Sequence, residues 1–104
     1  MILSIDHKIF NDIIKSPHHL AIASLSFRYK KYDAAYMGFI LPRILGPAHK
    51  RNLFKRRCKM IFHDMLSQRA FSSMGVIIKP KNIYIDYKDI NAAFNFLAEN
   101  VILK

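Results

Sequence analysis

The fold of this chain is decided by one stretch, residues 46–67, which reads GPAHKRNLFKRRCKMIFHDMLS. Proline is tolerated in the first turn of a helix, where its missing N–H has no partner to lose, so Pro47 marks a helix start. Apolar residues follow at i, i+4, i+7 and i+11, namely Phe54, Cys58, Ile61 and Met65. This spacing places them on one continuous stripe. The stretch therefore predicts a long helix that ends near Ser67 or Arg69 and packs its stripe on a core.

The polar flanks of this predicted helix are basic. A helix turns by about 100° per residue, so polar residues fall on both sides of the apolar stripe. The candidate phosphate-binding residues on these flanks and in the preceding loop are Arg43, Lys50, Arg51, Asn52, Lys55, Arg56, Arg57 and Lys59. Arginine can grip a phosphate with two parallel hydrogen bonds, whereas lysine acts as a point charge. Because each neutralised phosphate releases counterions, we expect binding that weakens as salt is added.

The charge of the whole chain supports this interpretation. Seventeen Lys and Arg residues face seven acids, which gives a net charge of +10. Ten of the seventeen lie between Arg28 and Lys59, where Asp33 is the single acid. Such clustering favours a nucleic-acid partner over a merely solvated helix face. A helix lying on a membrane surface would leave the apolar stripe without a core to pack on. The spacing alone does not distinguish RNA from DNA.

The remaining segments predict one domain over residues 1–104. We expect a helix over 5–15 that begins near Ser4 or Asp6, strands over 19–30, 34–41 and 74–79, and a last helix over 88–103. The strand over 34–41 is expected to run antiparallel to the first. Residues 83–87 could extend the third strand or form another. This order predicts an α+β fold, a single-domain two-layer sandwich with one mostly antiparallel sheet and helices packed against it.

The sequence predicts no catalytic or metal-binding site. Cys58 is the single cysteine, so it can form neither an intrachain disulfide nor a cysteine zinc site, and its place in the apolar stripe favours a core residue over a catalytic thiol. The histidines and carboxylates are scattered, without metal-ligand or paired-carboxylate spacing. The N-terminus lacks a signal-peptide pattern, and the apolar stretches are too short to span a bilayer. We therefore expect a cytoplasmic protein.

The stretch 46–57 resembles the signature of the bacterial ribonuclease P protein subunit. That signature runs Gly-Asn-Ala-Val, one variable residue, Arg-Asn-Arg, an aliphatic residue and Lys-Arg. The matching positions are Gly46, Ala48, Arg51, Asn52, Lys55 and Arg56, and two departures stand out, Pro47 and Leu53. Weaker likenesses cover residues 10–15, 74–80 and 89–97. The chain is thus similar to a divergent member of this family over nearly its whole length.

The resemblance implies a fold, a function and further site residues. The fold would contain a left-handed βαβ crossover, an exception to the usual hand. The active site would lie in an RNA subunit that uses Mg²⁺, and the protein would be an accessory subunit that binds ribonuclease P RNA and the 5′ leader of precursor tRNA during tRNA 5′-end maturation. No membrane or DNA partner is expected. The residues implied for a leader cleft are Phe10, Ile14, Phe27 and Tyr29. The strand alignment does not choose between Phe27 and Tyr29, and core packing is the alternative for all four.

Two other functions remain open on the sequence. The fold type and charge suit a small structural RNA-binding protein, similar to a ribosomal protein, without a role in cleavage. Copurification with ribosomes or with ribonuclease P RNA would separate the two. A nuclease that uses its own side chains has little support.

Overall fold

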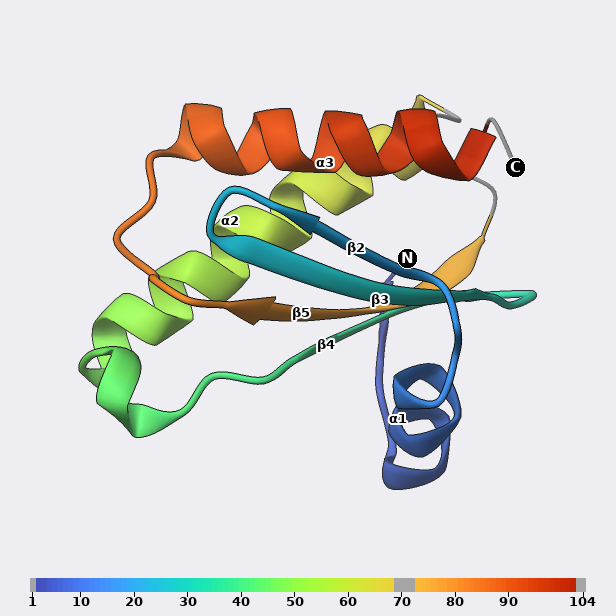
Figure 1. Ribbon diagram of the computed structural model, residues 1–104, viewed down its shortest axis with the longest axis horizontal. Helices are drawn as coiled ribbons and strands as arrows, with labels where there is room; N and C mark the ends of the chain where they lie inside the picture. The colour runs from blue at the N-terminus through green and yellow to red at the C-terminus, as the bar shows by residue number, and fades with distance from the viewer. Residues whose placement is uncertain (1, 69–72, 103–104) are drawn as a thin grey trace.

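The computed structural model describes residues 2–68 and 73–102, and it forms an α+β domain (Figure 1). In chain order the elements are β1 (Ile2–Ser4), α1 (His7–Ile14), β2 (His19–Ile22), β3 (Leu25–Lys31), β4 (Ala35–Phe39), the 3-10 turn η1 (Arg43–Leu45), α2 (Ala48–Ser67), β5 (Met74–Pro80) and α3 (Tyr87–Ile102). The expected α+β class and the long basic helix are confirmed. The alternative helix end at Arg69 and the expected last helical residue, 103, lie outside the described residues.

The five strands form one mixed sheet in the order β1-β4-β5-β3-β2. β4 pairs in parallel with both β1 and β5, whereas β3 pairs antiparallel with β5 and β2. The expectation of a mostly antiparallel sheet is therefore wrong. The strand over 35–39 does run opposite to β3, but β5 lies between the two. The sequence could not show this insertion, because β5 follows α2 in the chain and is therefore not adjacent in sequence to β3 or β4.

The chain passes from β4 to its parallel neighbour β5 through α2, so the expected βαβ crossover is present. In Figure 1 both strands run from right to left, α2 lies behind them, and β5 lies above β4. This arrangement has the left-handed sense, which is rare for such connections. The crossover lays the basic helix diagonally across one face of the sheet.

The segment 19–30, expected to be one strand, is a hairpin of β2 and β3. Ile22 pairs with Leu25, so Ala23 and Ser24 close a two-residue turn, and Ala23 has a φ of 53°. Tight hairpin turns use such left-handed residues and usually place Gly, Asn or Asp there. Alanine gave no turn signal, which explains the missed boundary. Residues 83–86 form no strand, and β1, only three residues long, was not expected.

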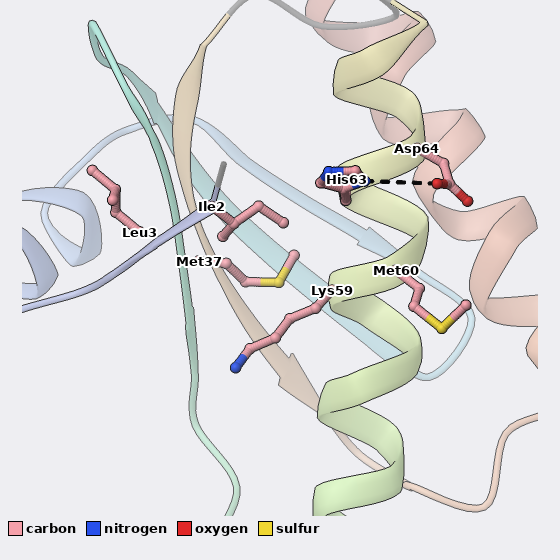
Figure 2. A pocket seen from close by; sticks show the side chains of 7 residues that line it. All are labelled: Ile2, Leu3, Met37, Lys59, Met60, His63 and Asp64. Atoms are coloured by element: carbon pink, nitrogen blue, oxygen red, sulfur yellow. Dashed lines mark ion pairs between the residues drawn. The ribbon is translucent and has the colours of Figure 1, made fainter.

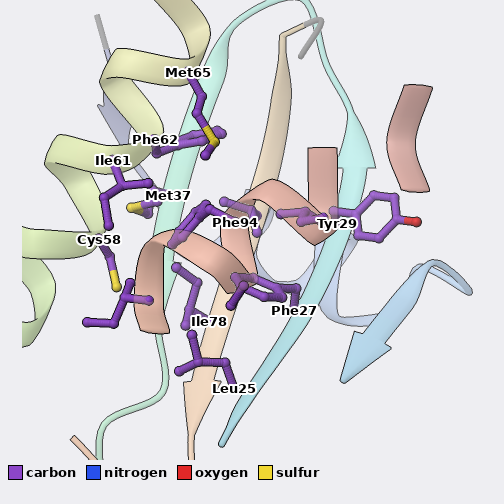
Figure 3. Close-up of a cluster of buried hydrophobic side chains, with 14 of the residues drawn as sticks. Leu25, Phe27, Tyr29, Met37, Cys58, Ile61, Phe62, Met65, Ile78 and Phe94 are labelled. Atoms are coloured by element: carbon purple, nitrogen blue, oxygen red, sulfur yellow. The ribbon is translucent and has the colours of Figure 1, made fainter. Parts of the chain in front are cut away.

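The main core lies between the sheet and the pair α2 and α3 (Figure 3). The predicted stripe is confirmed, because the buried residues of α2 are Phe54, Cys58, Ile61, Phe62 and Met65. From α3 the buried residues include Ile90, Phe94 and Leu97. β3 contributes Leu25, Phe27 and Tyr29, which alternate with half-buried residues. Alternation of this kind places successive side chains on opposite faces of a strand.

Helix α1 lies across the opposite face of the sheet, against β3 and β5 (Figure 1). Asp6 caps its start by accepting a hydrogen bond from the Ile9 N–H at 2.8 Å. Ile13 is its fully buried anchor, and a Cβ at Gly75 of β5 would lie 2.5 Å from the Ile13 Cδ1. Gly75 thus lets α1 approach closely. The two-layer sandwich therefore carries a partial third layer, and a groove forms beside it.

Candidate nucleic-acid interface

Helix α2 presents its basic residues as the helical spacing predicts. Phe54 and Cys58 are buried, whereas Asn52, Arg56 and Lys59 are exposed. The other predicted contacts outside the core are Arg43 and Lys50, which are exposed, and Arg51, Lys55 and Arg57, which are partly exposed. The eight candidate residues thus lie along the accessible flanks of α2 and in η1. Their role as binding residues stays a prediction.

The cations of α2 are not neutralised by acids within the described residues. The ion pairs found there join Lys30 to Asp12 at 2.8 Å and His63 to Asp64 at 3.8 Å, and neither uses a Lys or Arg of α2. An uncompensated positive flank attracts polyanions and speeds their association. The helix flank therefore has free charge with which to bind phosphate.

Two arginines of α2 also make structural contacts. Arg51 Nε donates to the carbonyl of Gly46 at 3.2 Å, and Arg57 Nη1 donates to the carbonyl of Ile85 at 3.5 Å. A guanidinium carries five N–H donors in a fixed fork, so each arginine keeps donors for a ligand. These bonds orient both side chains at the N-terminal half of the helix.

The opposite face of the sheet carries a groove of about 250 Å³ beside α1. Ile14 of α1 lines it, together with His19 of β2, Arg28 of β3, and Ile77 and Lys79 of β5. The apolar floor and the cationic rim suit a strand with bases and phosphates. Of the implied cleft residues, Ile14 and Phe27 line this groove. Phe10 lies one turn earlier on α1, half-buried, and does not line this groove within the described part of the chain.

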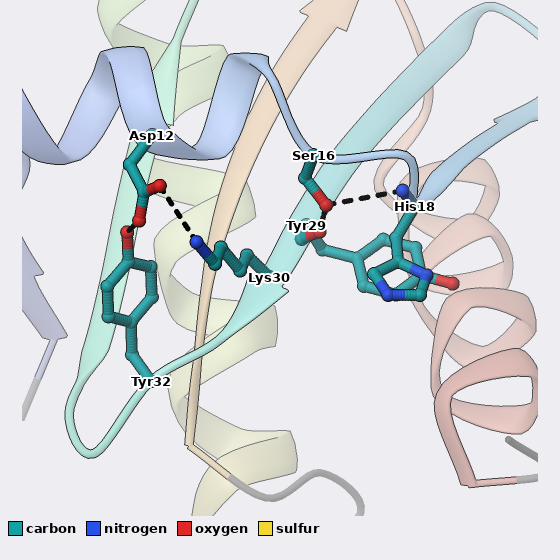
Figure 4. A network of polar contacts seen from close by, with 6 residues as sticks. All are labelled: Asp12, Ser16, His18, Tyr29, Lys30 and Tyr32. Atoms are coloured by element: carbon teal, nitrogen blue, oxygen red, sulfur yellow. Dashed lines mark hydrogen bonds and ion pairs between the residues drawn. The ribbon is translucent and has the colours of Figure 1, made fainter.

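The side chains of the two strand aromatics implied for the cleft pack in the core, and their role in a leader cleft stays a prediction. Phe27 is 0% exposed and packs edge-to-face on Phe94 with ring centroids 5.1 Å apart. Tyr29 is 6% exposed and stacks on His18 at 5.5 Å (Figure 4). Their parity on β3 directs both side chains into the core beside α3, although Phe27 also contributes to the lining of the groove.

Residues of the opposite parity also line the groove, and sequence reasoning missed them. Ser26 and Arg28 of β3 line it, and Arg28 Nη1 donates to the carbonyl of Ser16 at 2.8 Å. The signal was present in the alternation of residues 25–30. The alternation did not show that α1 covers the polar side of this strand.

A polar network fastens α1 over the sheet (Figure 4). One oxygen of Asp12 pairs with Lys30 at 2.8 Å, and the other accepts a hydrogen bond from the Tyr32 hydroxyl. The bond from Lys30, followed by that from Tyr32, lowers the pKa of Asp12. Desolvation, together with the bond to Asp12, raises the pKa of Tyr32 to about 12. Ser16 adds a hydrogen bond from its hydroxyl to the Tyr29 carbonyl at 2.8 Å. These bonds set the position of α1 and hence one wall of the groove.

A second hollow of about 550 Å³ opens between β1 and α2 (Figure 2). Ile2 and Met37 give it an apolar side, and Lys59, Met60 and His63 of α2 line the other. Lys59, one of the predicted contacts, thus stands beside an apolar hollow at the end of the basic flank.

The chemistry of the remaining candidates is limited. Burial raises the pKa of the Cys58 thiol to about 12, so the buried thiol is not a nucleophile at neutral pH. Within residues 2–68 and 73–102, no group of three or more His, Cys, Asp or Glu side chains could hold a metal ion. In the same ranges, no helix is both long and apolar enough to cross a membrane.

Known proteins share this fold and sequence pattern. A family model described as ribonuclease P matches residues 5–101. The Staphylococcus aureus RNase P protein aligns with a TM-score of 0.73 and 19% identity over 95% of this chain and 91% of that one. The RNase P protein from Thermotoga maritima aligns with a TM-score of 0.73 and 19% identity over 88% and 90%. A mutant of the S. aureus protein with defective mRNA degradation activity aligns with a TM-score of 0.73 and 19% identity, over 95% of this chain and 84% of that one. No curated protein sequence matches the chain.

Proposed function

Because the chain belongs to the ribonuclease P protein family, we propose that it holds the 5′ leader of precursor tRNA in the groove beside α1 while α2 binds the RNA subunit. Proteins of this family act as the protein subunit of ribonuclease P and work with its RNA. A structural RNA-binding role without a part in cleavage is not favoured, since the family match spans almost the whole chain.

The observation that carries the proposal is the pairing of two cationic surfaces on opposite faces of one sheet. The flank of α2 bears uncompensated Lys and Arg residues on one side, and the groove beside α1 is rimmed by Arg28 and Lys79 on the other. Because the two surfaces lie on opposite faces of the sheet, an RNA bound to α2 would leave the groove accessible to a second RNA strand. One protein can thus bridge a large RNA and the single-stranded end of its substrate.

The two surfaces suit different parts of that task. The exposed Arg56 and Lys59 of α2 favour phosphates of a folded RNA, because they can reach along a helix flank without competing acids. The groove combines Ile14 and Ile77 with cations, which suits an unpaired strand whose bases pack on apolar atoms. We assign the catalytic step to the RNA subunit with its Mg²⁺, as the family resemblance implies. The protein residues bind the two RNAs and orient them relative to each other. We also propose that the protein acts in the cytoplasm, where this kind of tRNA maturation takes place.

The test compares precursor tRNAs that carry a leader of several nucleotides with substrates that carry one nucleotide. The enzyme is reconstituted from this protein and the ribonuclease P RNA of the same organism, and the dissociation constant of each substrate is measured. We expect the longer leader to bind more tightly, and Lys79→Ala to remove part of that gain. Lys88→Ala on α3, on the other side of the sheet, is the charge-matched control. Equal binding of both substrates by the wild-type enzyme would refute the leader contact.

A further inference from the structure

The segment between β5 and α3 is fixed against its surroundings on both sides of Tyr84. Ile83 is buried in the core, and the carbonyl of Ile85 accepts the hydrogen bond from Arg57 of α2. Earlier in the segment, the Lys81 N–H donates to the carbonyl of Ser24 at 2.8 Å. The backbone that carries Tyr84 is therefore held in place.

Tyr84 itself remains exposed in this anchored segment. Its residue surface is 60% exposed, and its own N–H donates to Asn82 Oδ1 at 2.9 Å. The hydroxyl end of the ring lies beside Gly46, where an added Cβ would be 3.0 Å from the Tyr84 Oη and 3.5 Å from its Cζ. One end of the ring thus lies beside the turn before α2, and much of the residue's surface is open to solvent.

An arginine of α2 lies near this ring. Gly46, which lies beside the Tyr84 hydroxyl, also accepts the hydrogen bond from Arg51 Nε at 3.2 Å. No acid occurs between residues 43 and 59 of the sequence. Ile44, next to Arg43 in η1, is 91% exposed. Figure 1 shows the segment before α2 and the segment after β5 at the same end of the molecule. Tyr84 and Arg51 therefore lie on either side of Gly46 at an exposed part of the surface.

We propose that Tyr84 is a base-stacking residue, which takes an unpaired nucleobase of the RNA that α2 binds while Arg51 binds an adjacent phosphate. The inference rests on the proposed function for the presence of RNA and adds the aromatic contact. Aromatic rings in positively charged surroundings bind unpaired bases by stacking, and every base offers a face for it. The contact would extend the interface from α2 to the segment that precedes α3.

Stacking can be separated from phosphate binding because a tyrosine ring carries no charge. The ribonuclease P RNA of the same organism is titrated with each variant over a series of salt concentrations. We expect Tyr84→Ala to weaken binding about fivefold or more at every salt concentration, the scale of one lost stack. The slope of affinity against salt should stay that of the wild type, since no phosphate contact is lost. Tyr84→Phe should bind like the wild type.

The matched control is Phe96→Ala, which removes a ring 39% exposed on α3, and it should leave RNA affinity unchanged. Circular dichroism and thermal unfolding confirm that each variant is folded. Wild-type affinity in Tyr84→Ala would overturn the stacking inference and leave the proposed function standing. Equal losses in Tyr84→Phe and Tyr84→Ala would also overturn it, because the hydroxyl would then carry the contact. Absence of RNA binding by the wild type would overturn both.

Discussion

Arg28 of β3 and Ser16 at the end of α1 are joined by a hydrogen bond, in which Arg28 Nη1 donates to the Ser16 carbonyl at 2.8 Å. The bond ties the sheet to the segment that follows α1, and its guanidinium stands at the groove. One residue therefore fixes the groove wall and supplies part of its positive charge.

Replacement of Arg28 by alanine should cost both stability and leader affinity. A hydrogen bond from a charged donor to a partly buried carbonyl contributes about 2 kcal/mol, so the free energy of unfolding should fall by about that amount. Urea titration followed by circular dichroism measures it. Lys79→Ala serves as control, because Lys79 is exposed and such changes usually lie within about 0.5 kcal/mol. Equal stability of the two variants would contradict a structural role for the Arg28 bond.

Replacement of Arg56 by alanine should weaken RNA binding without loss of stability. Arg56 is exposed on α2, and the phosphate contact it is predicted to make contributes to the salt dependence. The slope of log affinity against log salt should become shallower by about 0.7 to 0.9. Arg51→Ala should show the same loss together with reduced stability, because Arg51 also bonds to Gly46. An unchanged slope in Arg56→Ala would remove this residue from the interface.

Stability at high pH should depend on Tyr32. Its folded-state pKa is raised to about 12 from an ordinary value of 10.0. The contribution of the neutral hydroxyl is therefore fully present below pH 10 and is lost as the pH rises toward 12. Tyr32→Phe should be less stable than the wild type at neutral pH, and this difference should shrink between pH 10 and 12. A difference that stays constant over that range would refute the link.

The same network should matter at low pH through Asp12. The pKa of this carboxyl is lowered in the folded protein, chiefly by the bond from Lys30. Its contribution is thus present above the ordinary value of 3.8 and is lost as the pH falls through the folded-state pKa. Asp12→Asn should flatten the acid loss of stability in a comparison of unfolding curves. An acid profile identical to the wild type would contradict the assignment.

Substitution of Gly46 should disturb the start of α2. Its φ of 155° favours glycine, and an added Cβ would lie 3.0 Å from both the Ile83 Cδ1 and the Tyr84 Oη. We expect Gly46→Ala to lower the free energy of unfolding by about 1–3 kcal/mol, the usual range for such backbone strain. Asn52→Ala, an exposed change on the same helix, is the control. Full stability of Gly46→Ala in thermal unfolding would show that the turn tolerates a side chain.

The sequence was most informative where one local rule decided the structure. The i, i+4, i+7, i+11 stripe identified α2 and its buried face, and Phe54 and Cys58 lie as that spacing predicts. The positions of the basic residues on both sides of this stripe were predicted from the same helical rotation per residue. Nothing beyond the helical period was needed for this part of the candidate site.

Tertiary arrangement decided what the sequence left undetermined. The parity of Phe27 and Arg28 on β3 was visible, but which parity faces α1 depends on the face of the sheet on which α1 packs against β3 and β5. The turn at Ala23 uses a left-handed conformation that alanine rarely adopts, so the hairpin had no sequence signal. The groove residues His19 and Lys79 come from strands far apart in the chain, and only the sheet order brings them together.

The most direct test of the central claim is reconstitution of precursor tRNA cleavage at low Mg²⁺. Ribonuclease P RNA from the same organism is incubated with its precursor tRNA, with and without this protein, and the cleavage rate is measured. A protein that places cations against both the RNA subunit and the substrate leader should reduce the repulsion between these two polyanions and so replace part of the Mg²⁺ requirement. The account predicts faster 5′-end cleavage with the wild-type protein and a smaller gain with Arg56→Ala. No acceleration at any salt or Mg²⁺ concentration by the folded protein would contradict it.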